Sequence, residues 1–263
     1  MTRFANLQSW KSWLDANRWV GTPEYTAAMV SHIRLVGLFD PLQGQADPPL
    51  ITINEENLRE SIVFRGLNSR HRAVLRVLLE TGLSDVSVVY APESVTGLAD
   101  LLRNNFRNFI ASEYLPSNSD REKLPGTRHE DIQRLSFEDA SIDAYVSCEV
   151  IEHIPSPRDA LCEAARVLRS GGIFIATFPF RTVEQDTLVK AVLENGQIRL
   201  LMEPEYHGNP VESGGSLVFS IPGWDILDTT RASGFSNVEM VAISSRLFGI
   251  VAPYSVLVMR AVR

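Results

Sequence analysis

The chain has 263 residues, of which 44% are hydrophobic and 22% are charged, and its formal net charge at pH 7 is -7. This composition is typical of a globular protein with a substantial core and excludes a disordered or fibrous chain. The negative balance, without a basic run, argues against nucleic acid as the main partner. No apolar stretch approaches the roughly 20 residues that span a bilayer, and the first residues lack the order of a signal peptide. We therefore expect a cytoplasmic protein without a membrane partner.

The first 67 residues are predicted to form a helical N-terminal cap. Phe4, Leu7, Trp10 and Leu14 recur at helical spacing, and residues 22–24 (Thr-Pro-Glu) are typical of a helix start. The segment is too short to bury a core of its own. Its three tryptophans are expected to pack internally or to form a homodimer contact.

Strand and helix patterns alternate from residue 68 to residue 180. Asn68 or Ser69 can cap a helix that stops at Gly82, and a proline-led helix from Pro157 is expected to end at Gly171. The strands expected in this part are 86–91, 108–114, 142–148 and 173–180. Such alternation predicts a parallel sheet covered by helices on both faces.

Residues 181–222 are predicted to form an insertion after the fourth of these strands. Asn195-Gly196 between two β-prone segments is a strong hairpin signal. A helix over 223–235 and strands over 238–244 and 254–262 then close the domain. The expected organisation is a cap over 1–67 and a single domain over 68–263 that contains the insertion.

Several motifs in the second half occur in a fixed order: Asp131, LSFEDASID, EVIEH, ALCEAARVLRSGG and TFPF. In this order and spacing, the segment resembles the class I S-adenosylmethionine (SAM)-dependent methyltransferases of the type-11-like group. The resemblance covers about residues 68–180 and implies a Rossmann-like α/β sheet of seven strands, the last antiparallel. It also implies SAM as cofactor and S-adenosylhomocysteine as product.

The same resemblance implies roles for residues at the ends of the strands. Glu113 would hold the ribose hydroxyls of SAM, since a carboxylate can accept two hydrogen bonds from a vicinal diol, and Asp131 would accept the adenine amino group. The alternative is that both are solvated turn residues. The expected cofactor contacts are Tyr90, Pro92, Glu93, Thr96, Glu113, Tyr114, Asp131, Ile132, Ser147, Cys148, Glu149 and His153.

The sequence departs from the family pattern after the first strand. Where glycines are expected, the run YAPESVTG has Pro92, Ser94 and Thr96, and the usual acidic residue is Tyr90. Glycines there let the backbone approach the cofactor. Side chains would push SAM outward or replace the backbone contacts with contacts of their own.

For the acceptor, His207 is the candidate general base, with Tyr206 and Trp224 as substrate-binding residues. Alternatively, His207 hydrogen-bonds its own loop. His153 could face the cofactor or serve the structure, and His32 is expected to pack or lie at the surface.

Other polar residues could form a metal site, an anion site or a disulfide. Residues 203, 205 and 207 (Glu, Glu and His) alternate as metal ligands would on a strand, but the strand would pass through Pro204, so no metal site is expected. The basic residues 70–72 would meet the SAM carboxylate or form a solvated helical turn. Cys148 and Cys162 are too few for a disulfide framework and are expected to be buried thiols.

The sequence thus predicts transfer of a methyl group from SAM to a small-molecule or glycan-like acceptor, at oxygen. One alternative is a binding or scaffold protein of the same fold that has lost methyl transfer. The other is a protein that uses bound SAM for a reaction other than methylation.

Overall fold

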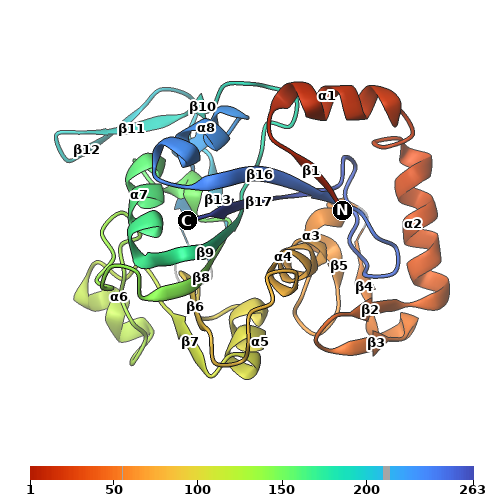
Figure 1. Cartoon of the computed structure of the whole chain (residues 1–263), viewed down its shortest axis with the longest axis horizontal. Helices are drawn as coiled ribbons and strands as arrows, with labels where there is room; N and C mark the ends of the chain where they lie inside the picture. Colours follow the sequence, from red (N-terminus) through yellow and green to blue (C-terminus); the bar gives the residue numbers. More distant parts are fainter. Residues whose placement is uncertain (55, 210–213) are drawn as a thin grey trace. The chain divides into compact units, whose positions relative to one another are not determined.

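The computed structural model describes residues 1–54, 56–209 and 214–263. Within this described part, the main sheet has seven strands in the order β1-β16-β17-β9-β8-β6-β7 (Figure 1). The predicted seven-stranded α/β sheet with an antiparallel last strand is confirmed. Two compact units make up the described chain, Met1–Leu83 with Glu239–Arg260 and Ser84–Val238 with Ala261–Arg263. The domain boundary expected between residues 67 and 68 stays a prediction.

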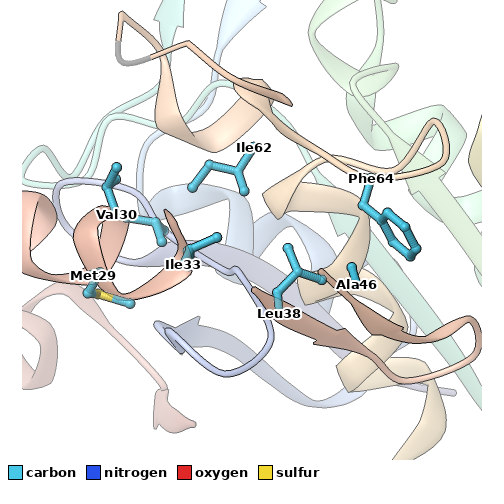
Figure 2. Close-up of a cluster of buried hydrophobic side chains, with 8 residues drawn as sticks. Met29, Val30, Ile33, Leu38, Ala46, Ile62 and Phe64 are labelled. Atoms are coloured by element: carbon cyan, nitrogen blue, oxygen red, sulfur yellow. The ribbon is translucent and has the colours of Figure 1, made fainter. Parts of the chain in front are cut away.

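The first unit contains the N-terminal helices and most of the last two strands. Its elements are β1 (Thr2–Phe4), α1 (Leu7–Ala16), α2 (Pro23–Val36), β2 (Leu38–Asp40), β3 (Gly44–Ala46), the 3-10 turn η1 (Pro48–Leu50), β4 (Thr52–Ile53), α3 (Leu58–Ser61), β5 (Ile62–Val63), α4 (Ser69–Leu79), and most of β16 (Ser236–Ile243) and β17 (Val256–Val262). Figure 2 shows a buried cluster of this unit, in which Met29, Val30 and Ile33 of α2 gather with Leu38, Ala46, Ile62 and Phe64. The amphipathic face of α2 is thereby removed from water.

Phe4 was expected to start the first helix, and this prediction is wrong. Phe4 ends β1, which pairs antiparallel with β16 and sets Phe4 opposite Met240. The helix α1 begins at Leu7, directly after its N-cap residue Asn6, whose side chain accepts a hydrogen bond from the Ser9 backbone at 2.9 Å. Trp10, fully buried, stacks on Trp13 with ring centroids 5.3 Å apart, as internal packing predicts.

The basic residues at the start of α4 were expected to be either solvated or turned to the cofactor. All three are buried, with Arg70 bonded to Glu60 and His71 in a capping box with Asn68. Arg72 is fully buried and binds backbone carbonyls of its own unit. The prediction of a solvated helical turn is therefore wrong, because the two arginine side chains are buried and form hydrogen bonds with other groups of the protein.

The second unit contains the parallel part of the sheet. Its elements are β6 (Val88–Ala91), α5 (Gly97–Asn105), β7 (Asn108–Ala111), α6 (Asn118–Lys123), β8 (Ile142–Cys148), the 3-10 turn η2 (Ile151–His153), α7 (Pro157–Val167), β9 (Leu168–Thr177), β10 (Leu188–Val189), β11 (Ala191–Glu194), β12 (Gln197–Leu200), β13 (Tyr206–His207), β14 (Ser216–Leu217), β15 (Ser220–Ile221) and α8 (Asp225–Ala232). Strands β7, β6, β8 and β9 lie side by side and pair in parallel (Figure 1). Their carboxyl ends consequently share one edge of the sheet.

Two local predictions for this unit have different outcomes. The hairpin is confirmed: β11 pairs with β12, and Asn195 and Gly196 turn the chain with φ of 52° and 75°. The helix expected to end at Gly171 ends earlier, at Val167, because the chain becomes extended at Leu168 and Gly171 lies within β9.

The two cysteines were both expected to be buried. Cys148 is buried, but Cys162 is exposed on α7, so the prediction for Cys162 is wrong.

Among the helices described, none has both the length and the apolar character of a membrane span.

Candidate functional site

Glu113 lies just beyond the end of β7, on the edge where the parallel strands end. Its oxygen Oε1 accepts hydrogen bonds from the backbone N–H of Ser94 at 2.7 Å and from the Ser94 hydroxyl at 3.0 Å. Its second oxygen has no hydrogen bond within the described part of the chain. Ser94, one of the residues that replace glycine, therefore closes the loop onto Glu113 but leaves one carboxylate oxygen available.

The remainder of that loop is held by its own side chains. The Thr96 hydroxyl caps α5 by accepting from the Ala99 backbone at 3.1 Å, and it donates to Glu93. Glu93 is almost fully buried beside the first turn of α5, where a carboxylate is favoured by the helix dipole. Glu93 and Thr96 thus order the loop that the sequence proposed as a cofactor contact.

Tyr90, at the position where the family has an acidic residue, does not reach the edge of the sheet. It is fully buried, its hydroxyl lies 2.8 Å from that of Ser112, and its ring packs edge-on against Tyr145 and Phe137. Burial raises the pKa of Tyr90, so the phenol stays neutral. Tyr90 thus packs between strands, and its role as a cofactor contact stays a prediction that this packing does not favour.

Asp131 follows a single parallel bridge between Glu113 and His129, which stands where a third strand was implied. Backbone hydrogen bonds from Glu113 to Arg128 and from Glu130 to Glu113, at 2.9 and 3.1 Å, bind the two acidic segments together. The Asp131 carboxylate accepts from the backbone and side chain of Gln133 through one oxygen. Glu113 and Asp131 are therefore held on neighbouring segments.

The neighbours of these two acids differ in exposure. Tyr114 is 64% exposed, with its ring 5.6 Å from that of His129, whereas Ile132 is buried at 7%. Burial would raise the pKa of Glu130, but hydrogen bonds from Ser136 and Arg128 hold it below its usual value. Tyr114 is thus available to a ligand, and Ile132 offers only a small apolar surface.

Two buried hydroxyls without a partner lie at the ends of β8 and β9. Ser147 and Thr177 are each 1% exposed, and the side-chain oxygen of each has no hydrogen-bond partner in the described structure. Cys148 pairs in register with Thr177, and Glu149 follows with a positive φ of 54°. Orphaned polar atoms at this edge fit a polar ligand such as the methionine part of SAM, because buried hydroxyls are rarely left unpaired.

Beyond β8, the turn η2 and the strand β13 bring together a cluster of titratable groups. Glu152 is fully buried, with its Oε1 3.6 Å from Nε2 of His153 and 3.8 Å from Nδ1 of His207. The other ring nitrogen of His207, Nε2, lies 3.0 Å from Glu205, which is paired with Lys190. Sequence reasoning missed Glu152, although the acidic residue before His153 in EVIEH was a visible signal.

The carboxylates of this cluster determine the charge of His207. Glu152 raises the pKa of His207 to about 9, and Glu205 adds to this against the opposing effect of burial. These carboxylates thus favour the protonated form of the imidazole at neutral pH. The role of His207 as general base stays a prediction.

The two residues expected to bind the acceptor differ in exposure. Tyr206 is 58% exposed on β13, but Trp224 is 1% exposed, donates its indole N–H to Thr182 at 2.9 Å and packs against Phe180. Trp224 therefore anchors the start of α8 in the core, and its role as a substrate contact stays a prediction that this burial does not favour.

Comparison with known proteins gives the same assignment as the motifs. Residues 97–176 match the family model described as a methyltransferase domain. A probable S-adenosylmethionine-dependent methyltransferase of Mycolicibacterium smegmatis is 32% identical over 148 residues, which cover 54% of this chain and 52% of the relative. A ubiquinone/menaquinone biosynthesis C-methyltransferase of Bartonella quintana is 30% identical over 129 residues, 49% of this chain and 40% of the relative.

Among solved structures, an S-adenosylmethionine-dependent methyltransferase of Mesorhizobium loti is similar, with 13% identity and a TM-score of 0.45 over 72% of this chain and 98% of that one. The chain spans about half the length, or less, of the curated relatives that it matches. The match over α5 to β9 includes the edge that carries Glu113, Asp131 and EVIEH. These matches show that residues 97–176 form a methyltransferase domain of the class I SAM-dependent type.

Proposed function

We propose that this protein transfers a methyl group from SAM to an oxygen atom of a small-molecule or glycan-like acceptor. The single observation that carries the proposal is the pair Glu113 and Asp131, held on adjacent segments at the carboxyl edge of the sheet. SAM supplies the reactive methyl carbon and the leaving group. The cytoplasmic location and the homodimer expected from the sequence stay predictions.

Each side chain at this edge has a distinct task in the proposal. The free oxygen of Glu113 accepts from a ribose hydroxyl, and Asp131 accepts from the adenine amino group. The unpartnered hydroxyls of Ser147 and Thr177 bond to the methionine part. Pro92, Glu93 and Thr96 shape the loop that covers the cofactor, with Tyr114 beside the ribose acid.

The acceptor is assigned to the insertion, residues 181–222, where the exposed ring of Tyr206 supplies an apolar surface. The net charge of -7 supports a small acceptor rather than nucleic acid. His207, next to Tyr206 on β13, contacts the acceptor in this proposal.

The cofactor part is tested by calorimetry with SAM and S-adenosylhomocysteine. We expect Glu113→Gln to weaken binding about 10- to 100-fold, since one hydrogen bond to a charged group is lost. Glu122→Gln, a matched change on the exposed surface of α6, should leave affinity unchanged. Absence of binding by the wild-type protein would overturn the proposal.

A second function is favoured by the contact of Ser94 with Glu113. If that contact takes the place of the ribose, the protein keeps the fold as a binding protein without methyl transfer. Ser94→Gly should then create or greatly tighten SAM binding, whereas in the methyltransferase its effect is small. Mass spectrometry of S-adenosylhomocysteine formed with methylated product separates transfer from a non-methylating use of bound SAM.

A further inference from the structure

Glu152, His153 and His207 converge from two segments far apart in sequence. The first two belong to the turn η2, and the third belongs to β13 in the insertion. One oxygen or nitrogen atom from each lies within 4.8 Å of the other two. We propose that these three side chains bind a divalent first-row transition metal ion.

The distances between the three side chains are slightly longer than the distances between ligand atoms around a bound ion. Oε1 of Glu152 is 3.6 Å from Nε2 of His153 and 3.8 Å from Nδ1 of His207. A tetrahedral ion with bonds of about 2.1 Å separates its ligand atoms by about 3.4 Å. The Glu152 oxygen has to move only a few tenths of an ångström closer to each imidazole nitrogen. The two imidazole nitrogens have to approach each other by a somewhat larger distance. The two rings stand at 88° to each other, so neither blocks the other's nitrogen.

The outward nitrogen of each imidazole is already engaged as a donor. Nδ1 of His153 lies 2.9 Å from the carbonyl oxygen of Leu217, which can only accept, so Nδ1 carries the proton. Nε2 of His207 lies 3.0 Å from the Glu205 carboxylate and is a donor for the same reason. The nitrogens that face Glu152 are therefore the ones that can bind an ion, and on His207 the ion takes the place of the proton that the neighbouring carboxylates favour. A histidine that donates its far N–H to a carbonyl or a carboxylate is the usual arrangement of a metal ligand.

Glu152 supplies an independent indication of a missing cation. Its side chain is fully buried, and neither of its oxygens has a hydrogen-bond partner in the described structure. A buried carboxylate without hydrogen bonds is costly, and binding to a metal ion removes that cost. Among the residues that the structure describes, no backbone N–H donates to either oxygen of Glu152.

Backbone hydrogen bonds hold the two ligand segments in place. The Phe219 N–H donates to the Glu152 carbonyl at 2.7 Å, and the Val218 N–H donates to the Glu205 carbonyl at 2.8 Å. Strand β14 pairs with β13, which sets His207 opposite Ser216. The ligands are therefore fixed by main-chain contacts that do not depend on the ion.

The donor set indicates which ion fits. Two imidazole nitrogens and one carboxylate oxygen suit Zn²⁺, Fe²⁺, Ni²⁺ or Co²⁺ better than Mg²⁺ or Ca²⁺, which prefer oxygen ligands alone. Three protein ligands leave coordination positions for water or for an oxygen of a bound molecule. Glu205, which the sequence grouped with His207 as a possible ligand, instead acts behind it as a positioning residue.

Calorimetry with Zn²⁺ tests the site on the full chain after chelator treatment, without SAM, so the result is independent of the proposed function. We expect one Zn²⁺ per chain, with a rise in melting temperature that follows the occupancy. Glu205→Gln should weaken binding about 10- to 100-fold, as loss of an outer partner does, and His207→Ala should weaken it by more than about 100-fold. His207 is partly exposed, so this variant is expected to fold.

His32→Ala, which removes a histidine of α2 in the other unit, is the matched control and should bind Zn²⁺ as the wild type does. Co²⁺ in place of Zn²⁺ provides a spectroscopic readout, because its visible bands should shift when Glu205 is changed. Failure of the wild-type chain to bind stoichiometric Zn²⁺ would overturn the proposal. Binding that survives His207→Ala unchanged would overturn it as well.

Discussion

Replacement of Arg72 by methionine should be among the most destabilising single changes in the first unit. The guanidinium donates to four carbonyl oxygens: Nε to Phe248 at 2.8 Å, Nη1 to Leu67 at 2.8 Å, and Nη2 to Ile62 and Gly249, both at 2.7 Å. Burial lowers the pKa of Arg72 to about 10, and the nearby charge of Asp40 opposes this, so the side chain stays protonated at neutral pH. One buried cation thereby ties the segment before α4 to the loop between β16 and β17.

The magnitude follows from these four bonds. At roughly 1 kcal/mol net for each, and with the acceptors left without a donor, Arg72→Met should lower the free energy of unfolding by about 3–5 kcal/mol. This is a large part of a typical domain stability of about 5–15 kcal/mol. The melting temperature should fall by roughly 10 °C. Arg72→Lys keeps the charge but not the planar fork, so its loss should be intermediate.

Arg76→Met is the matched control, one turn further along α4. Its guanidinium lies over the Phe248 ring at 4.7 Å, a contact worth about 0.5–1 kcal/mol. Urea denaturation followed by tryptophan fluorescence and circular dichroism measures both variants. The reasoning is refuted if Arg72→Met costs less than about 1 kcal/mol or no more than Arg76→Met.

Three further changes test other parts of the structure. Tyr90→Phe should cost about 1 kcal/mol in urea denaturation, through loss of the Ser112 hydrogen bond, and leave SAM affinity unchanged in calorimetry; weakened SAM binding would return Tyr90 to the cofactor site. Glu130→Gln should lower the free energy of unfolding by about 1–3 kcal/mol at pH 7. Because the folded-state pKa of Glu130 lies below its unfolded value, this stabilisation is present above the unfolded pKa and is lost as pH falls through the folded one, so wild type and variant should converge in acid denaturation. Gly215→Ala should weaken Zn²⁺ binding in calorimetry, since φ is 74° and a Cβ would lie 2.6 Å from the backbone oxygen of His207; unchanged affinity would show that β13 tolerates the shift.

The sequence alone determined the class of the fold and the order of its parts. Local signals in the chain set these features: the β-branched strands, the cap residues Thr22, Asn68 and Ser156, and the Asn195-Gly196 turn. Backbone preference and side-chain periodicity act over a few residues, and they can be read without a partner segment. The acidic residues Glu113 and Asp131 were implied by the resemblance to the methyltransferases, from the order and spacing of the motifs.

Tertiary structure decided how the polar side chains are used. Arg72 looks like part of a solvated basic turn until the segment at 248–249 covers it, and Trp224 looks like a substrate contact until Phe180 packs against it. Arg72 is buried by a segment more than 100 residues away in the sequence, so its burial cannot be predicted from the residues next to it. The contact of Glu152 with His207 has the same origin, because the insertion folds back onto the turn after β8. The sequence therefore specified which groups are present, and long-range packing decided which of them meet.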